Sequence, residues 1–259
     1  MRIKKFLGLS TLTRADLQLL LDVTAEMKKI VLSKNKRAPH LIGKTVVGLF
    51  ERGTGADLVW ATACKYLGGN YFTGTPDDLF ACAAIGADAV LLGGSAAEVA
   101  EYAEAAKPVA INAGTEEEDP VGALGVLATL RETFDAFSGL KVALCGDPGH
   151  SGTANSLCCA LLQYGCDVRA LAPFLCLPKV SVPRLPREEV ASADVVYFCP
   201  LSPAGEACVA KEEFAEFFLP QAEKPIVSFG NVGREKDKTE QAYTNTVAAA
   251  MAVLYLATR

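Results

Sequence analysis

Arginine and histidine are scarce in this sequence of 259 residues. It holds 10 arginines and 2 histidines, and 25 Lys plus Arg stand against 30 Asp plus Glu. The resulting net charge of −5 argues against binding to nucleic acid, because nucleic-acid-binding proteins usually carry a basic stripe, and against binding to an anionic membrane. Chemistry that needs several cations or imidazoles has few residues to use here.

Long apolar segments are also lacking. No run of roughly 18–20 apolar residues occurs, so the sequence predicts no membrane-spanning helix. Residues 1–6 lead into an amphipathic helix rather than into the apolar centre of a signal peptide. We therefore expect a soluble, cytoplasmic protein.

Paired cysteine motifs are missing as well. None of the 9 cysteines belongs to a C-x-x-C pair, and most of them lie in apolar stretches such as 142–145. Small buried thiols in a reducing compartment explain this pattern better than a metal or redox centre does. We predict no metal and no cofactor.

What the sequence does contain is an alternation of apolar strands and helices. A capping box, formed by Thr13 and Asp16, predicts the start of the first long helix. Asp119 before Pro120 predicts a capped start for another, because aspartate is favoured at the N-cap and proline at the next position. The first half is expected to hold strands at 44–50, near 71, 87–92 and 109–112, and further helices at 56–67, 78–85, 96–106 and 120–137.

The same alternation restarts after a junction at 137–139. Strands are predicted at 140–145, 167–172, 195–199 and 226–229, with helices at 153–164, near 188, 211–218 and 240–257. The strands are apolar without polar alternation, which is typical of parallel sheets covered by helices on both faces. The predicted fold class is α/β, with two doubly wound parallel-sheet domains, 1–137 and 138–238.

Ligands of such folds bind at the carboxyl ends of the strands, so the loops there are the candidate sites. After the first strand, Arg52, Gly53, Thr54 and Gly55 form a glycine turn before a helix, where backbone N–H groups could meet an anion. The turn has no phosphate-binding lysine, and Asp57 would repel a phosphate. A tight turn with a capped helix is the favoured interpretation.

The loop after the strand at 140–145 carries glycines at 146, 149 and 152, which do not match G-x-G-x-x-G, so no dinucleotide site is predicted. His150 and Ser151 are adjacent, but neighbours in a loop seldom face each other. No acid that would orient the imidazole is identifiable. We expect His150 to be an exposed loop histidine.

The order of these segments resembles the aspartate and ornithine carbamoyltransferase family along nearly the whole chain. The resemblance rests on segments that follow the family's order: 6–9, 41–51, 65–69, 88–90, 108–114, 140–147, 155–157 and 241–243. It implies a carbamoyl-phosphate domain, 1–137, completed by a returning last helix at 239–259, and an amino-acid domain, 138–238. It also implies a trimer.

The functional motifs depart from that family's pattern. Its Ser-Thr-Arg-Thr-Arg is here Gly53-Thr54-Gly55-Ala56-Asp57, and its Arg-His is Gly93-Gly94. The family's His-Pro-x-Gln motif corresponds to residues 119–122, so the histidine that polarises the carbamoyl carbonyl in the family is replaced by Asp119. An arginine of the family's second domain corresponds to a position at or near Gly152. Its His-Pro-Leu-Pro-Arg loop is 230–234, where only Arg234 matches, and its long loop with a serine and a lysine is cut to about 70–76.

These departures predict a carbamoyltransferase-like protein without the enzyme's chemistry, and no catalytic residue is assigned. One hypothesis is a structural or regulatory subunit, in a homotrimer or in a mixed trimer with a related carbamoyltransferase chain. Another is a binder, or an enzyme with a changed substrate, that takes a less anionic small molecule. An active aspartate- or ornithine-type carbamoyltransferase is the third. Candidate ligand-binding residues of the cleft are Arg52, Gly53, Thr54, Gly55, Asn112, Asp119, His150, Asn231 and Arg234.

Overall fold

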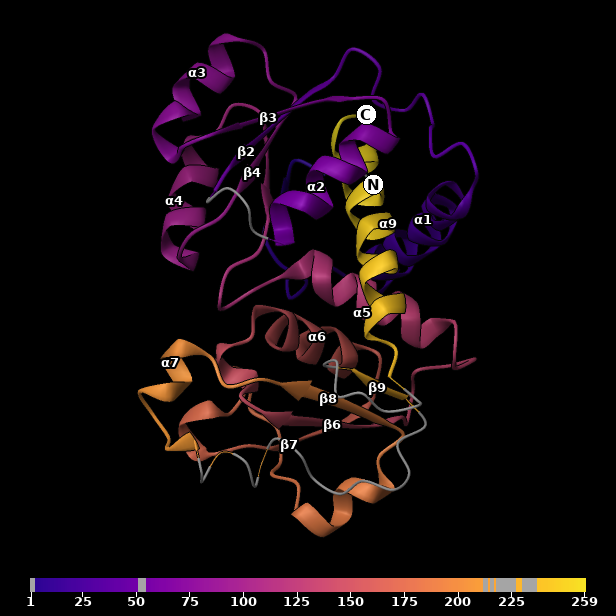
Figure 1. The fold of residues 1–259 in the computed structure, drawn as a ribbon, viewed down its shortest axis with the longest axis vertical. Helices are drawn as coiled ribbons and strands as arrows, with labels where there is room; N and C mark the ends of the chain where they lie inside the picture. Colours follow the sequence, from indigo (N-terminus) through magenta and orange to yellow (C-terminus); the bar gives the residue numbers. More distant parts are fainter. Residues whose placement is uncertain (1–2, 51–54, 212–213, 215–216, 218–226, 230–236) are drawn as a thin grey trace.

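The chain forms two parallel β-sheets, one above the other in Figure 1, in a computed structural model. The structure describes residues 3–50, 55–211, 214, 217, 227–229 and 237–259. The first sheet has the order β1-β5-β4-β2-β3 and the second the order β7-β6-β8-β9. All described strand pairs are parallel. The α/β fold class predicted from the sequence is confirmed.

The first sheet consists of β1 (Lys5–Phe6), β2 (Thr45–Leu49), β3 (Asn70–Gly74), β4 (Ala89–Leu92) and β5 (Val109–Asn112). Four of these strands are predicted from the sequence. The fifth, β1, is not, because two residues are too few to show a periodicity. It is held by its pairing with β5, in which Phe6 lies opposite Ile111.

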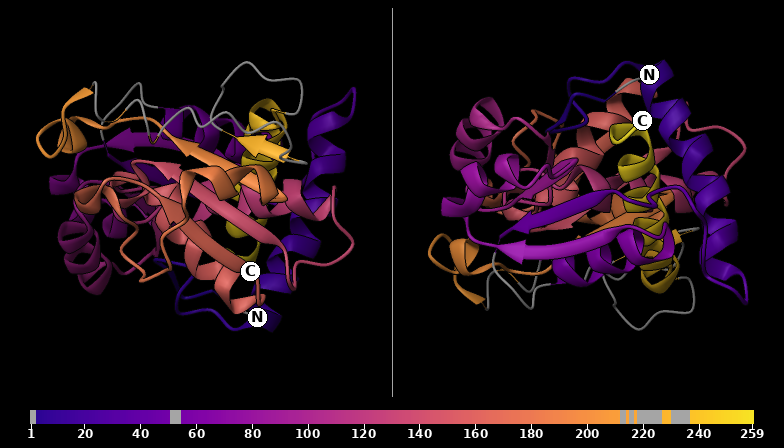
Figure 2. Two further views of the ribbon diagram at one scale, coloured as in Figure 1. Left: turned by 90° about the horizontal axis from the view of Figure 1, so that it is seen from below. Right: turned by 90° about the horizontal axis from the view of Figure 1, so that it is seen from above.

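Helices cover both faces of this sheet (Figures 1 and 2). On one face, α3 (Leu79–Ala84), preceded by the 3-10 turn η1 (Pro76–Asp78), and α4 (Ala96–Ala105) pack against alternate strand residues. On the other lie α1 (Arg14–Leu32) and α2 (Gly55–Tyr66). The capping box predicted at the start of α1 is confirmed, since Thr13 and Asp16 exchange side-chain-to-backbone hydrogen bonds of 3.2 Å each.

Two helices form the centre of the molecule, α5 (Pro120–Arg131) and α9 (Thr239–Ala257). Nearly every residue of α5 is buried, and α9 runs back from the second sheet to pack against α1, α2 and α5 (Figure 1). The predicted return of the last helix to the first half is confirmed. The sequence places the end of α5 at 137, but the helix ends six residues earlier, at Arg131. Phe137 lies beyond the helix and is buried, where its ring packs edge-on against the ring of Tyr164 with the ring centroids 4.8 Å apart.

The second sheet consists of β6 (Lys141–Gly146), β7 (Asp167–Leu171), β8 (Val195–Cys199) and β9 (Val227–Phe229). α6 (Gly152–Gln163) covers the face toward the first sheet, and the 3-10 turn η4 (Arg187–Ser192) lies against the other. Shorter elements are the 3-10 turns η2 (Pro148–His150) and η3 (Phe174–Cys176) and the helix α7 (Pro203–Glu206). Most of the predicted helix at 211–218 lies outside the described residues.

The cysteines occupy the interior, as the sequence predicts. Seven of the nine are buried, Cys159 is half-buried and Cys208 is exposed. In the described part of the chain, no helix is long and apolar enough to cross a lipid bilayer.

Candidate functional site

A cavity of about 450 Å³ lies between the two halves of the molecule. Its walls come from α2, the start of α5, the start of α6, the end of β8 and the first turns of α9. None of the described residues that line it is Lys, Arg or His, and the one charged side chain among them belongs to Asp119. The described lining residues are Ala56, Val59, Trp60, Ala113, Asp119, Val121, Gly122, Val126, Thr153, Tyr197, Phe198, Pro200, Thr239, Ala242, Tyr243 and Thr246.

Asp119 is held firmly at the N-terminus of α5. One carboxylate oxygen, Oδ1, accepts a 2.9 Å hydrogen bond from the backbone N–H of Gly122, and Oδ2 accepts one of 2.7 Å from the Thr153 hydroxyl. The backbone N–H of Asp119 itself donates to Ser156 Oγ at 3.1 Å. The predicted N-cap is therefore confirmed, and it ties the first half of the chain to α6.

Burial dominates the electrostatics of this carboxyl group. It raises the pKa of Asp119 above its ordinary value, although the hydrogen bonds from Gly122 and Thr153 act in the opposite direction. Tyr197 also lines the cavity, and burial raises the pKa of its phenol as well. Asp119 and Thr153, which are hydrogen-bonded to each other, and Tyr197 thus place polar groups in the wall of an otherwise mostly apolar cavity.

Two backbone segments pack closely together at Gly152, next to Thr153 of the cavity wall. A Cβ atom at this position would lie 2.0 Å from the carbonyl oxygen of Thr115 and 3.0 Å from the backbone nitrogen of Asp119. Both neighbours are backbone atoms, which cannot turn aside as a side chain can. The start of α6 and the loop at 115–119 therefore meet at a distance that only glycine permits.

Gly93 and Asp57, two positions singled out in the sequence, lie in closely packed surroundings in the first half of the molecule. A Cβ at Gly93 would lie 2.5 Å from Cβ of Phe50. Asp57, in the first turn of α2, accepts a 2.7 Å hydrogen bond from the Tyr71 hydroxyl. The acid that the sequence places beside the glycine turn thus remains at this helix start, held by a neighbouring strand.

Asn112 has a structural role. It is 3% exposed, and its amide nitrogen donates to the carbonyl oxygens of Leu7 at 2.9 Å and Glu118 at 3.4 Å. Its amide oxygen accepts a 2.9 Å hydrogen bond from the backbone N–H of Gly114. These contacts shape the loop that leads to Asp119 and engage both ends of the amide.

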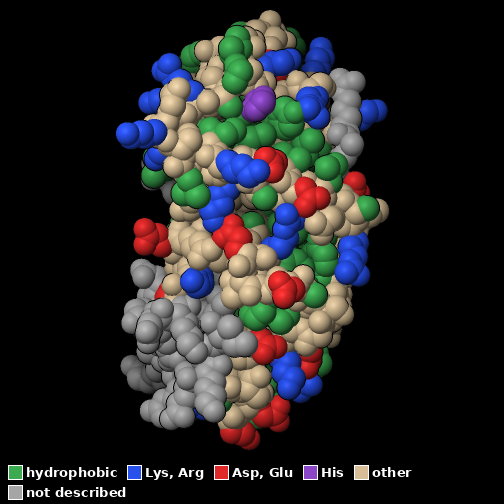
Figure 3. Space-filling view, turned by 90° about the vertical axis from the view of Figure 1, so that its right-hand side faces the viewer, with side chains coloured by type: hydrophobic (Ala, Val, Ile, Leu, Met, Phe, Trp, Pro, Cys, Tyr) green, Lys and Arg blue, Asp and Glu red, His purple; other side chains and the backbone are tan. Residues whose placement is uncertain are grey.

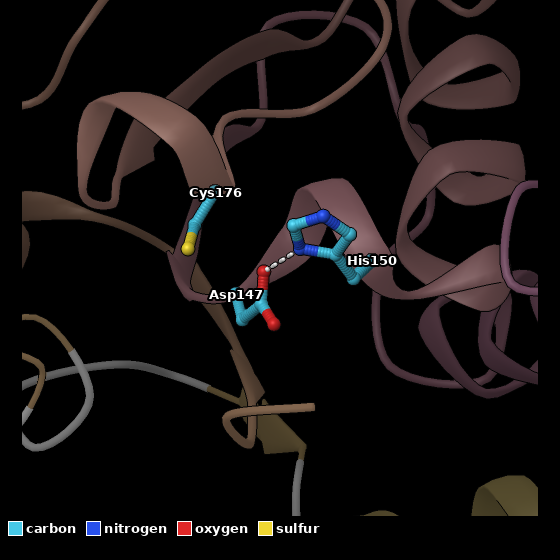
Figure 4. Close-up of side chains that lie close together, drawn as sticks. All are labelled: Asp147, His150 and Cys176. Carbon is cyan, nitrogen blue, oxygen red and sulfur yellow. Dashed lines mark hydrogen bonds and ion pairs between the residues drawn. The ribbon is translucent and has the colours of Figure 1, made fainter. Parts of the chain in front are cut away.

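The sequence-based expectation for His150 is wrong. Its side chain is 20% exposed rather than free in solvent, and Nδ1 lies 2.7 Å from Oδ1 of Asp147, whose side chain is fully buried (Figure 4). The orienting acid that the sequence did not reveal is three residues away, because the 3-10 turn η2 brings residues three apart onto one side. His150 does not line the cavity that holds Asp119.

Asp147 is the centre of this second cluster. Its Oδ2 accepts hydrogen bonds from the hydroxyl and the backbone N–H of Ser202, at 2.8 and 3.1 Å. Burial alone would raise the pKa of Asp147, but the hydrogen bonds from His150 and Ser202 outweigh burial and hold the pKa below its usual value. Cys176 completes the cluster, with ligand atoms of the three residues within 4.8 Å of one another (Figure 4).

The cluster is not arranged as a nucleophile with its base. Burial, together with the nearby Asp147 carboxylate, raises the pKa of the Cys176 thiol to about 12. A cysteine nucleophile needs the opposite effect, a lowered pKa. The geometry therefore provides no activated thiol.

Several candidate ligand-binding residues cannot be assigned to the cavity or to the cluster around Asp147. Arg52, Gly53, Thr54, Asn231 and Arg234 lie outside the described residues, and Gly55 is the first residue of α2. Sequence analysis in turn missed residues that the fold brings together: Trp60, Thr153 and Tyr197 at the cavity, and Asp147, Cys176 and Ser202 in the cluster. Only the spacing of Asp147 and His150 was a usable sequence signal.

Comparison with known proteins identifies the family. No family model matches the chain. The aspartate carbamoyltransferase catalytic subunit of Acetivibrio thermocellus is 30% identical over 307 aligned positions, which cover 100% of this chain and 97% of that protein. This chain belongs to the carbamoyltransferase family. The alignment is longer than the 259 residues present here, so the relative carries segments that this chain lacks.

Solved carbamoyltransferase structures share the fold. Aspartate transcarbamoylase from Trypanosoma cruzi, in complex with carbamoyl aspartate and phosphate, matches with a TM-score of 0.84 at 17% identity, over 100% of this chain and 97% of that one. Ornithine carbamoyltransferase from Pyrococcus furiosus matches with a TM-score of 0.81 at 23% identity, over 98% and 97%. The fold of these proteins is thus retained around a cavity whose described lining holds no cation.

Proposed function

We propose that this chain is a carbamoyltransferase-family protein that has lost carbamoyltransferase activity. The observation that carries the proposal is the place of the Asp119 carboxylate. It caps the N-terminus of α5, where the backbone N–H groups and the helix dipole would otherwise attract an anion. A carboxylate there opposes the binding of a phosphate dianion.

The charge of the cavity supports this proposal. Catalysis of carbamoyl transfer depends on positive groups that hold a phosphate and stabilise a developing oxyanion, and each lost donor of this kind commonly costs about 10²- to 10³-fold in rate. The described lining residues supply no Lys or Arg. Loss of four or five donors would remove on the order of 10 kcal/mol of transition-state stabilisation, which is most of what many enzymes provide.

Gly152 supports it independently. The family resemblance places an arginine at or near this position. A Cβ atom at Gly152, which any arginine there would have, would lie 2.0 Å from the carbonyl oxygen of Thr115. An arginine would have to push the loop at 115–119 away from α6. The local backbone is therefore adapted to the absence of that side chain.

A non-catalytic subunit is the function that fits best. We expect it to assemble as a homotrimer or as a mixed trimer with a related carbamoyltransferase chain, through the first half of the molecule. On the face shown in Figure 3, hydrophobic side chains gather over the upper half, which the first sheet, its covering helices and α9 form. The first half of the chain, taken over all its faces, exposes the large hydrophobic side chains of Ile42, Leu58, Phe72 and Phe80. Contiguous exposed apolar patches often mark contact surfaces.

A second candidate function is the binding of a small, uncharged or cationic molecule in the cavity. About 450 Å³ lined by Trp60, Tyr197 and other largely apolar groups, with one carboxylate, is of the size and character of a ligand site. The aromatic faces and Asp119 would favour a positive group over a negative one. An enzyme with a changed substrate would use the same space.

The assignment of residues 1–137 with 239–259 as a carbamoyl-phosphate-like domain, and of 138–238 as an amino-acid-like domain, belongs to the same proposal. So does a cytoplasmic location, which the abundance of free, mostly buried cysteines favours.

Calorimetric titration with carbamoyl phosphate, alone and with aspartate or ornithine, tests the loss of activity when it is combined with an assay for carbamoylated product. We expect neither heat of binding nor product, while the catalytic subunit from Acetivibrio thermocellus gives both under the same conditions. Micromolar binding, or turnover that disappears in Thr54→Ala, would contradict the proposal. Light scattering and co-purification with an intact carbamoyltransferase chain separate the subunit from the ligand binder.

A further inference from the structure

The cluster of Asp147, His150 and Cys176 lies apart from the cavity and is not explained by the proposed function. We propose that these three side chains form a binding site for a divalent transition metal ion of the zinc type. Their ligand atoms, a carboxylate oxygen, an imidazole nitrogen and a thiol sulfur, all lie within 4.8 Å of one another (Figure 4).

The present distances are within about 1 Å of those that such an ion needs. Zinc binds sulfur at about 2.3 Å and nitrogen or oxygen at about 2.0–2.2 Å in tetrahedral geometry, which places neighbouring ligand atoms roughly 3.2–3.8 Å apart. His150 Nδ1 and Asp147 Oδ1, now 2.7 Å apart, would need to separate by about 0.6 Å, and ligand atoms as far apart as 4.8 Å would need to approach by about 1 Å. Rotation of the three side chains can supply these movements.

The donor set also suits zinc. One thiolate and one imidazole favour a borderline-soft ion over magnesium or calcium, which prefer oxygen ligands. On binding, the Cys176 thiol releases its proton to solvent, and His150 coordinates through Nδ1 with its proton on Nε2. The thiolate and the Asp147 carboxylate then balance the two positive charges, so the buried centre is neutral.

The backbone holds the three ligands in place before any metal binds. Gly149 packs so closely against the next segment that a Cβ there would lie 2.4 Å from the carbonyl oxygen of Leu177 and 3.0 Å from that of Cys176. Buried Asn155 links the same segments, since its amide donates to the carbonyl of Gly149 at 3.1 Å and accepts from the N–H of Lys179 at 2.9 Å. The turn with His150 and the turn with Cys176 are therefore fixed to each other.

Asp147 is oriented from its other side. The hydrogen bonds from the hydroxyl and N–H of Ser202 hold Oδ2, which leaves Oδ1 directed at His150. Such supporting hydrogen bonds are usual behind metal-binding carboxylates and fix the ligand's direction. Three protein ligands leave a fourth position for water, the pattern of an open zinc site.

Zinc binding tests this proposal with the full-length chain, reduced and freed of metal by a chelator. In competition with a chromogenic chelator, we expect one Zn²⁺ per chain. Cys176→Ala and His150→Gln should each weaken binding at least about 100-fold, and Ser202→Ala about 10- to 100-fold, because loss of a supporting hydrogen bond costs that much. Cys159→Ser, which removes a half-buried thiol from α6, is the control and should bind as the wild type does.

Cobalt gives a spectroscopic readout that begins with the wild-type chain. Co²⁺ added to the wild-type chain should produce a thiolate-to-metal charge-transfer band and the intense visible bands of four-coordinate cobalt. Cys159→Ser should keep both, and His150→Gln should weaken the visible bands even if Cys176→Ala does not fold. No thiolate band in the wild type, or zinc binding unchanged in both Cys176→Ala and His150→Gln, would overturn the proposal.

Discussion

Asn245 of α9 donates a 2.8 Å hydrogen bond to the hydroxyl of Thr129 in α5, inside the fully buried contact between the two central helices. The Thr129 hydroxyl in turn donates to the carbonyl of Gly125 at 2.9 Å. Among the described residues, the amide oxygen of Asn245 has no hydrogen-bond partner. The nitrogen is therefore the only end of this buried amide that the described contacts satisfy.

Thr129→Val tests this contact. The substitution keeps the shape of the side chain but removes the acceptor, so the amide nitrogen of Asn245 loses its partner as well and neither end of the buried amide is satisfied by a described contact. We expect the free energy of unfolding in urea to fall by about 1–3 kcal/mol. Thr133→Val is the control, because Thr133 is exposed and its hydroxyl donates to the carbonyl of Thr129 at the end of the same helix, so its loss should cost no more than about 0.5 kcal/mol. Equal losses in the two variants would contradict the role of Asn245.

Gly152→Ala should destabilise the protein strongly. Its Cβ would overlap backbone atoms of Thr115 and Asp119, and we expect a loss of more than about 3 kcal/mol in urea unfolding. Gly86→Ala is the matched control, because Gly86 has a φ of +74° but nothing within 4 Å of the added Cβ. That change should cost about 1–2 kcal/mol, the strain of the left-handed conformation alone. A Gly152→Ala variant as stable as Gly86→Ala would show that the loop at 115–119 can move.

The raised pKa of Asp119 predicts a pH dependence of stability. Because the folded state holds this proton at higher pH than the unfolded chain does, the stabilisation is complete below the ordinary aspartate pKa of about 3.9. It is then lost as the pH rises through the raised folded value. Asp119→Asn does not titrate, so the wild-type minus variant difference in unfolding free energy should decrease with rising pH and then level off. A difference that grows with pH would contradict the burial of this carboxyl group.

The proposed assembly predicts different effects of two exposed phenylalanines. Phe72 in the first sheet is 56% exposed and Phe174 in the second half is 75% exposed. Phe72→Asp should place a charge in the subunit contact and lower the molar mass measured by light scattering at a given concentration. Phe174→Asp should leave the mass unchanged. Dissociation by Phe174→Asp alone would place the contact in the second half instead.

The sequence predicted the elements whose signals are local. The capping box of Thr13 and Asp16, the Asp119 N-cap and the strands at 109–112 and 195–199 depend on residues within one turn or one strand. It did not predict β1, whose two residues are a strand only because β5 lies beside them. The early end of α5 was missed for the same reason, since Phe137 packs against a distant partner, Tyr164.

The candidate sites were predicted less well, for a related reason. Asp119, a candidate from the sequence, lines the cavity, but Tyr197 and Trp60 reach it from elements far away in the sequence. His150 was assigned to the surface because its acid, Asp147, becomes a partner only in a 3-10 turn, and because Cys176 is 26 positions further along the chain. Side-chain clusters of this kind depend on how two turns pack, which composition and periodicity do not encode.

The return of α9 to the first half has a consequence for synthesis on the ribosome. The second sheet is built from one continuous stretch, 141–229, whereas the interior shared by α1, α2 and α5 is closed only by residues 239–257. Nearly the whole chain must therefore be translated before the segment made first can bury its apolar side chains. Until then, the nascent N-terminal half is the part that needs protection from aggregation, and its folding waits for the last helix to emerge.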